Sequence, residues 1–268
     1  MYTLIVRYLK DKKTSIIAYS VAEILFVTMY VSLFPALKKQ SEELQKLLAT
    51  YPKELYSVFQ IQDLNFSTLE KFLGLEQYSF MWPILAVILV ISLAGGAIAN
   101  EINRGTIGNI LAKPVSRMQF YFARYVAGVK AFAIFVIISI FCVIPIAAIF
   151  NVDFVAKAYA ILAVLCFLFG LAIYSVAFMF SALFSEKGKV YMVTAGLVVV
   201  MYVLNVVASL RDGLKGLRYA SFFYYFDFNT ALNQYYIRWL AVVVFLGVTV
   251  VCTALGAYIF KKRDIATS

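Results

Sequence analysis

Six long apolar runs constrain the fold of this chain more than any other feature of its sequence. A transmembrane helix needs about 20 apolar residues, because each residue rises about 1.5 Å through a hydrocarbon core of about 30 Å. Hydrophobic residues make up 63% of the 268 residues, against roughly 45–50% in soluble domains. We therefore predict a single all-α integral membrane domain with six transmembrane helices, at residues 16–34, 78–99, 131–150, 158–184, 190–210 and 239–260.

The distribution of charge predicts how the helices are oriented. Cytoplasmic loops of membrane proteins are enriched in Lys and Arg. With the N-terminus inside, the inner segments carry 14 of the 24 basic residues and 4 of the 14 acidic ones, so the net charge of +10 lies on one face. We expect both termini to be cytoplasmic in a multi-pass membrane protein. The basic excess then reflects topology, and nucleic acid is not an expected partner.

Three segments outside the apolar runs have patterns of their own. Residues 1–15 alternate apolar and basic side chains, which is typical of an interfacial elbow helix. Residues 35–77 predict an extracellular helical cap, with an amphipathic stretch around Leu44–Leu48 and a capping box from Ser67 to Glu70. This cap either covers an exit path or packs on the membrane surface. Residues 211–238 hold an aromatic cluster that predicts an interfacial anchor or a partly re-entrant helix.

Several kinds of chemistry are disfavoured by what the sequence lacks. It contains no histidine, the commonest general base and metal ligand. Its three cysteines all fall inside apolar runs and have no CxxC spacing, so they are expected to be buried hydrophobic residues. No Asp lies in a predicted span either, which disfavours an aspartyl protease. We therefore predict no catalytic residue and no metal site, and expect that the chain is not an enzyme.

One acidic residue falls inside a predicted span. Glu23 lies about seven residues into the first run, where an unpaired carboxylate costs several kcal/mol. Lys130, at the start of the third run on the same side, is a candidate partner. Two interpretations stay open: a structural Glu23–Lys130 pair, or a carboxylate on a hydrated translocation surface.

The inner connection between the second and third spans is the most polar stretch of its neighbourhood. Asn100 and Glu101 favour a helix start, and Pro114 favours its end, which predicts a helix of about twelve residues. Gly105, Gly108 and Ala112 would form a stripe of small residues on it. Each glycine costs nearly 1 kcal/mol in a helix, which indicates close approach to another surface. The alternative is a plain interfacial connector.

The motif Glu101-x-x-x-Gly105-Thr106, followed by Pro114-x-Ser116-Arg117, resembles that of ABC-2-type transporter permeases. The resemblance extends over nearly the whole chain, through "ALFSEKGK", "SFFYYFDFNTAL" and the terminal "FKKRD". It implies that residues 100–117 are the coupling helix region, which contacts a separate ATPase. The residues it assigns to coupling are Glu101, Arg104, Gly105, Thr106, Gly108, Pro114, Ser116 and Arg117.

The resemblance also implies a function. The chain lacks a GxxxxGK[ST] phosphate loop, so ATP and Mg²⁺ would be bound by two partner ATPase subunits. Two permease copies, or this chain with a paralogue, would form the path of an ABC exporter. The apolar composition favours a hydrophobic or amphipathic substrate such as a lipid, peptide or drug. The alternative is a polytopic membrane protein of another class, such as a secondary transporter or a scaffold.

Overall fold

The computed structural model describes residues 1–39, 67–108, 115–210 and 212–263, which form helices and turns and contain no strand. Six helical segments are long and apolar enough to cross a membrane, which confirms the predicted number of spans. Two of them are composite, since α4, η1 and α5 form the second and α8 with α9 forms the third. The elements are α1 (Tyr2–Lys39), α4 (Leu69–Leu73), η1 (Gly74–Met81), α5 (Trp82–Gly95), α6 (Ala99–Asn103), α8 (Arg117–Phe141), α9 (Val143–Ile149), α10 (Ala156–Leu183), α11 (Lys187–Leu210), η2 (Asp212–Ala220), α12 (Phe222–Tyr225), α13 (Phe228–Asn233) and α14 (Trp239–Lys262).

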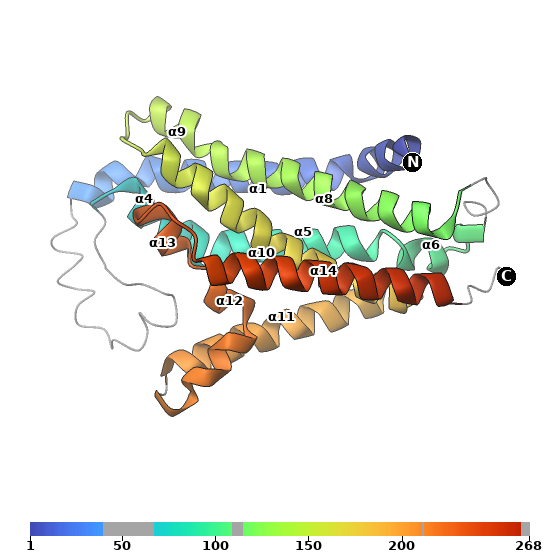
Figure 1. Cartoon of the computed structure of the whole chain (residues 1–268). Helices are drawn as coiled ribbons and strands as arrows, with labels where there is room; N and C mark the ends of the chain where they lie inside the picture. Colours follow the sequence, from blue (N-terminus) through green and yellow to red (C-terminus); the bar gives the residue numbers. More distant parts are fainter. Residues whose placement is uncertain (40–66, 109–114, 211, 264–268) are drawn as a thin grey trace.

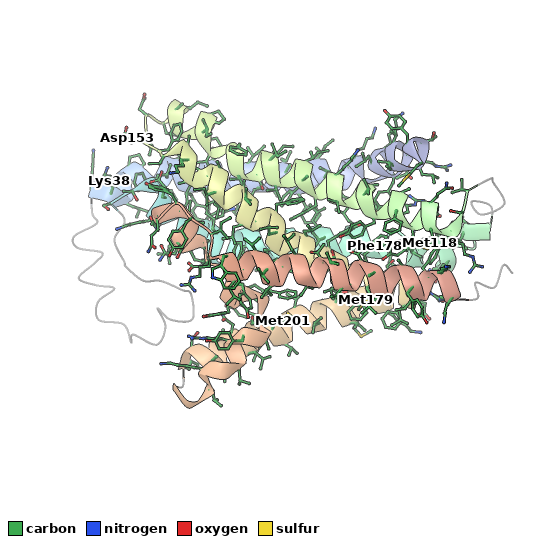
Figure 2. All side chains as sticks on the ribbon, viewed as in Figure 1. Lys38, Met118, Asp153, Phe178, Met179 and Met201 are labelled. Carbon is green, nitrogen blue, oxygen red and sulfur yellow. The ribbon has the colours of Figure 1, made fainter. Side chains whose placement is uncertain are left out.

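The start of α1 and the end of α14 lie at the same end of the bundle, next to α6 and the start of α8 (Figure 1). We call this the terminal end. The opposite end is formed by α4, α9, α13 and η2. Lys38 and Asp153 lie there, far from Met118 at the terminal end (Figure 2). An even number of spans requires this arrangement, because each pair of crossings returns the chain to its starting side.

Helix α10 is the centre of the bundle. It packs against α5, α8, α13 and α14, and most of its residues are buried. Small residues let neighbouring helices approach closely. Gly170 of α10 faces the ring of Phe132, and Gly128 of α8 faces the ring of Tyr174, so closely that a Cβ on either glycine would overlap the ring.

The helices extend further than the apolar runs alone predicted. The elbow at residues 1–15 and the span at residues 16–34 form one continuous helix, α1. The second span begins at Leu69 instead of residue 78, and the third at Arg117 instead of residue 131. Both extensions contain polar residues, Gln77 and Arg124, which are buried against protein. A polar residue at such a position contacts protein inside the bundle, so it does not end the membrane-spanning helix.

The predicted capping box at Ser67 is wrong. The N-cap of α4 is Thr68, whose hydroxyl accepts from the backbone N–H of Lys71 at 3.4 Å. The carboxylate of Glu70 turns away and accepts from the backbone N–H of Val155 at 2.7 Å. Glu70 thereby fixes α4 to the start of α10. The amphipathic stretch predicted around Leu44–Leu48 lies outside the described residues.

The aromatic residues before α14 divide into two groups, a core group and a surface group. Phe226 packs on Phe169 with ring centroids 4.5 Å apart and stacks on Trp82 at 6.0 Å. These contacts are in the protein core, so a purely interfacial anchor is wrong for this part of the segment. Tyr236 and Trp239 are instead 50% and 74% exposed, as a membrane-interface position requires.

Candidate functional site

The predicted coupling segment begins with a sharp break after α5. Helix α5 ends at Gly95, and the backbone N–H groups of Ile98 and Ala99 both donate to Ser181 Oγ of α10, at 3.3 and 3.0 Å. Ser181 is fully buried. The start of α6 is therefore fixed to the central helix of the bundle.

Helix α6 ends in a Schellman motif. The N–H of Gly105 donates to the carbonyl of Ile102, and that of Thr106 to the carbonyl of Glu101, both at 3.0 Å. This pattern requires a left-handed residue just beyond the helix end, and Gly105 has φ = +66°. The predicted helix of about twelve residues is therefore wrong, because α6 ends at Asn103. Gly105 is needed for its left-handed conformation. Its small size, the expected reason for a glycine here, is not required, since an added Cβ would meet open space.

The carboxylate of Glu101 faces the protein. It forms an ion pair with Arg124 Nη2 of α8 at 2.6 Å and accepts from Thr106 Oγ1 at 2.5 Å. The guanidinium of Arg124 lies over the rings of Tyr8 and Phe120, at 4.9 and 5.3 Å from their centroids. The Tyr8 hydroxyl in turn donates to the carbonyl of Leu93. Glu101 thus connects α6 to α8, α1 and α5.

The second half of the motif shapes the start of α8. Ser116 is the N-cap of this helix, and it forms a complete capping box with Gln119, at 3.1 and 3.0 Å. Arg117 Nη1 donates to the backbone carbonyl of Arg263 at 2.7 Å. Pro114 lies outside the described residues.

Arg263 continues this connection to the central helix. Its Nη1 donates to the carbonyls of Ala182 and Phe184, at 2.9 and 3.2 Å, and its Nη2 donates to Ser185 Oγ. Partial burial lowers the pKa of this guanidinium from its ordinary value. The "FKKRD" and Pro-x-Ser-Arg motifs, far apart in sequence, therefore meet at the C-terminal end of α10.

Arg104 is the charged residue of a short exposed stretch that also includes Asn103 and Gly105. It lies at the rim of a cavity of about 710 Å³ that α1, α6, α8 and α11 enclose at the terminal end. We call this cavity the basic pocket, because its lining has five cationic and two acidic residues: Arg7, Lys12, Arg104, Arg124 and Lys187, with Asp11 and Glu101. Gly108 is partly exposed and helical, and the residues that follow it lie outside the described ranges.

The two intramembrane candidates are not brought together. Glu23 is fully buried and accepts from Gln77 Nε2 of η1 at 2.5 Å, whereas Lys130 is exposed on α8. The predicted Glu23–Lys130 pair is therefore wrong. A hydrated surface position is also wrong for this conformation. Gln77 was missed in sequence because it precedes the predicted start of the second span.

The Glu23–Gln77 contact leaves one polar atom on each side without a partner. Within the described residues, Glu23 Oε2 and Gln77 Oε1 have no hydrogen bond. Gln77 lies in the π-helical η1, and π-helical turns are frequent at functional sites. A protonated carboxyl would donate from Oε2 to the amide oxygen and satisfy both groups.

Arg124 is the main residue of this site that motif reasoning missed. The sequence showed it only as one more inner positive charge. The sequence feature that could have identified Arg124 is its position one helical turn inside an apolar stretch, where a charge requires a partner. Glu101 was the nearest acidic residue of the same inner segment.

Comparison with known proteins supports what the geometry and the motif indicate together. The family model of ABC-2 family transporter proteins matches residues 3–265. A search of curated proteins finds no match. The family match sets aside the alternative of a secondary transporter or scaffold unrelated to ABC transporters. The chain therefore belongs to the ABC-2 transporter family, as a multi-pass membrane permease.

Proposed function

We propose that this chain is the permease subunit of an ATP-driven exporter, and that α6 with the turn at residues 104–106 contacts a separate ATPase. The Glu101–Arg124 ion pair is the observation that carries this proposal. It joins an exposed turn to a side chain that is 5% exposed in the bundle. A push on the turn is therefore transmitted to α8, and through the Tyr8 ring to α1.

ATP hydrolysis belongs to the partner in this proposal. The chain has no phosphate loop, so two ATPase subunits would supply ATP and Mg²⁺. Their closure would bias the spans between two arrangements, inward-facing and outward-facing. The terminal end is then cytoplasmic, in agreement with the charge distribution, and the membrane is the bacterial plasma membrane.

Two permease copies, or this chain with a paralogue, would complete the translocation path. Helices α11 and α14 support this proposal, because long rows of their apolar residues are exposed. Examples are Met192, Val199 and Val203 of α11, and Val243, Val250 and Tyr258 of α14. Some of this surface faces lipid, and a second copy would cover the rest.

Affinity purification of the tagged permease from its own host tests the contact with the ATPase. We expect the wild-type chain to capture a protein with a phosphate-loop motif, and Arg104→Glu to lose that capture, because Arg104 is the exposed charge on the turn. Lys10→Glu is the matched control, since Lys10 is also exposed near the terminal end but does not line the basic pocket. Equal capture by both variants would contradict the proposed contact.

A further inference from the structure

The basic pocket has an excess of positive charge that the chain itself does not neutralise. Arg124 is paired with Glu101. Lys12 lies within electrostatic range of Lys187, Arg124 and Arg104, with Asp11 as its acidic neighbour. Within the described ranges, no carboxylate forms an ion pair with Lys12, Arg104 or Lys187. Converging cations without acidic partners are typical of sites for phosphate and other anions.

An apolar groove lies further along the bundle and shares no lining residue with this pocket. It lies between α5 and α11, has a volume of about 290 Å³ and is almost free of polar surface. Ile84, Ile88 and Ile91 form its α5 wall, and Ala195, Val198 and Tyr202 its α11 wall. Helix α11 slants away from the bundle toward the opposite end (Figure 1), and the groove lies between the two helices.

Two consecutive glycines, Gly95 and Gly96, follow the last groove residue of α5, Ile91, and Gly96 lines the pocket. The ring of Tyr191 packs directly on Gly95, and the ammonium group of Lys12 packs directly on Gly96, so a Cβ at either position would overlap its neighbour. Lys187 Nζ lies 5.2 Å from the centroid of the same Tyr191 ring. Helical spacing places Lys187, Tyr191 and Ala195 along one face of α11. Lys187 of the pocket and Ala195 of the groove are eight residues apart on α11, so about 12 Å of helix separates the cationic site from the apolar one.

We propose that the pocket and the groove together bind an anionic phospholipid, with its phosphate among Lys12, Arg104 and Lys187 and an acyl chain in the groove. A free anion would use the pocket alone, and an uncharged hydrocarbon the groove alone. Only an anionic amphiphile satisfies both, with Tyr191 at the boundary between head and tail. The further step that this lipid is the transported substrate rests on the proposed function, whereas the binding site itself does not.

Lipid titration of the purified permease, delipidated and without any ATPase, tests the site. Phosphatidylglycerol binding would be measured by native mass spectrometry, with phosphatidylcholine and free glycerol phosphate as comparison ligands. We expect Lys12→Gln/Lys187→Gln to weaken phosphatidylglycerol binding about thirtyfold, because each basic residue near a lipid surface contributes roughly fivefold. Lys13→Gln/Lys189→Gln is the matched control, since both lysines are exposed and neither lines the pocket. It should bind as the wild type does.

A second variant tests the groove independently. Ala195→Phe fills the α11 wall without altering any charge, and it should weaken phosphatidylglycerol binding while leaving any weak binding of glycerol phosphate unchanged. The proposal is overturned if the two double variants bind phosphatidylglycerol equally, or if free glycerol phosphate binds as tightly as the lipid. It is also overturned if Lys12→Gln/Lys187→Gln loses ATPase capture but keeps lipid binding, since the pocket then receives an acidic segment of the ATPase. Lipid binding without any ATPase capture by the wild type would refute the proposed function alone.

Discussion

The left-handed conformation of Gly105 ends α6 and directs the chain toward the exposed turn. A residue with a Cβ pays about 1–2 kcal/mol to adopt this conformation, which explains a glycine at a position with open space around it. The same Schellman motif places the Thr106 hydroxyl on the Glu101 carboxylate. Two of the motif residues are therefore needed to build the turn itself.

Replacing Gly105 by Ala should open this turn. We expect a local loss of about 1–2 kcal/mol, measured as faster hydrogen–deuterium exchange of the Gly105 and Thr106 amides. Gly105→Asn should have a smaller effect, since Asn tolerates the left-handed region. Gly188→Ala is the control, because Gly188 also has open space around it but lacks the positive φ. Equal exchange in the three variants would show that the Schellman motif does not hold the turn.

Removing only one partner of the Glu101–Arg124 pair should lower the stability of the protein strongly. The two side chains are 19% and 5% exposed, and removing one partner of a buried pair costs roughly 3 kcal/mol. Glu101→Gln should therefore lower the melting temperature strongly, and the double variant Glu101→Gln/Arg124→Met should recover part of the loss. The exposed Lys189–Glu186 pair is the comparison, and Glu186→Gln should cost less than about 1 kcal/mol. Additive effects in the double variant would contradict the pairing.

At the scale of elements, the packing of α8 on α10 depends on glycines facing aromatic rings. A Cβ at Gly170 would overlap the Phe132 ring, and overpacking of this kind costs about 1–3 kcal/mol. Gly170→Ala should therefore destabilise the bundle. Gly247→Ala should be neutral or slightly stabilising, because Gly247 of α14 faces open space and alanine is the better helix former. Thermal unfolding in lipid nanodiscs compares the two, and equal melting temperatures would refute close packing at Gly170.

The length of the apolar runs was sufficient to predict the number of membrane spans and their order, because a membrane span needs a length that few other structures need. It failed where polar residues belong to the bundle interior. Gln77 and Arg124 were read as outside the spans, yet each has an internal partner, Glu23 and Glu101. Composition cannot distinguish a polar residue that faces water from one whose partner comes from another helix.

The sequence motif placed the candidate site at residues 100–117 but did not predict its geometry. Its residues were read as a face for a partner. Glu101, Thr106, Ser116 and Arg117 instead make contacts within the chain. A Schellman motif and a long-range ion pair depend on backbone angles and tertiary packing, which one sequence does not contain. Arg104, Gly105 and Ser116 are the exposed residues among the described part of the motif, and Arg104 is the charged one.

At the scale of the whole molecule, a cytoplasmic terminal end requires the opposite end of the bundle to face the outside of the cell. Lys189→Cys at the terminal end should react with an impermeant maleimide only after the cells are permeabilised, whereas Asn151→Cys at the opposite end should react in intact cells. Both positions are exposed, and Cys166, a native cysteine, is fully buried. The reverse labelling pattern would contradict the orientation derived from the charge distribution.

In the proposed function, an ATPase contacts the exposed turn after α6. Photocrosslinking from a benzoylphenylalanine placed at Arg104 in living cells tests it most directly, with the same probe at Tyr219 of η2, exposed at the opposite end, as the control. We expect a crosslinked protein with a phosphate-loop motif from position 104 and none from position 219. An ATPase crosslinked from neither position, or from both equally, would contradict it.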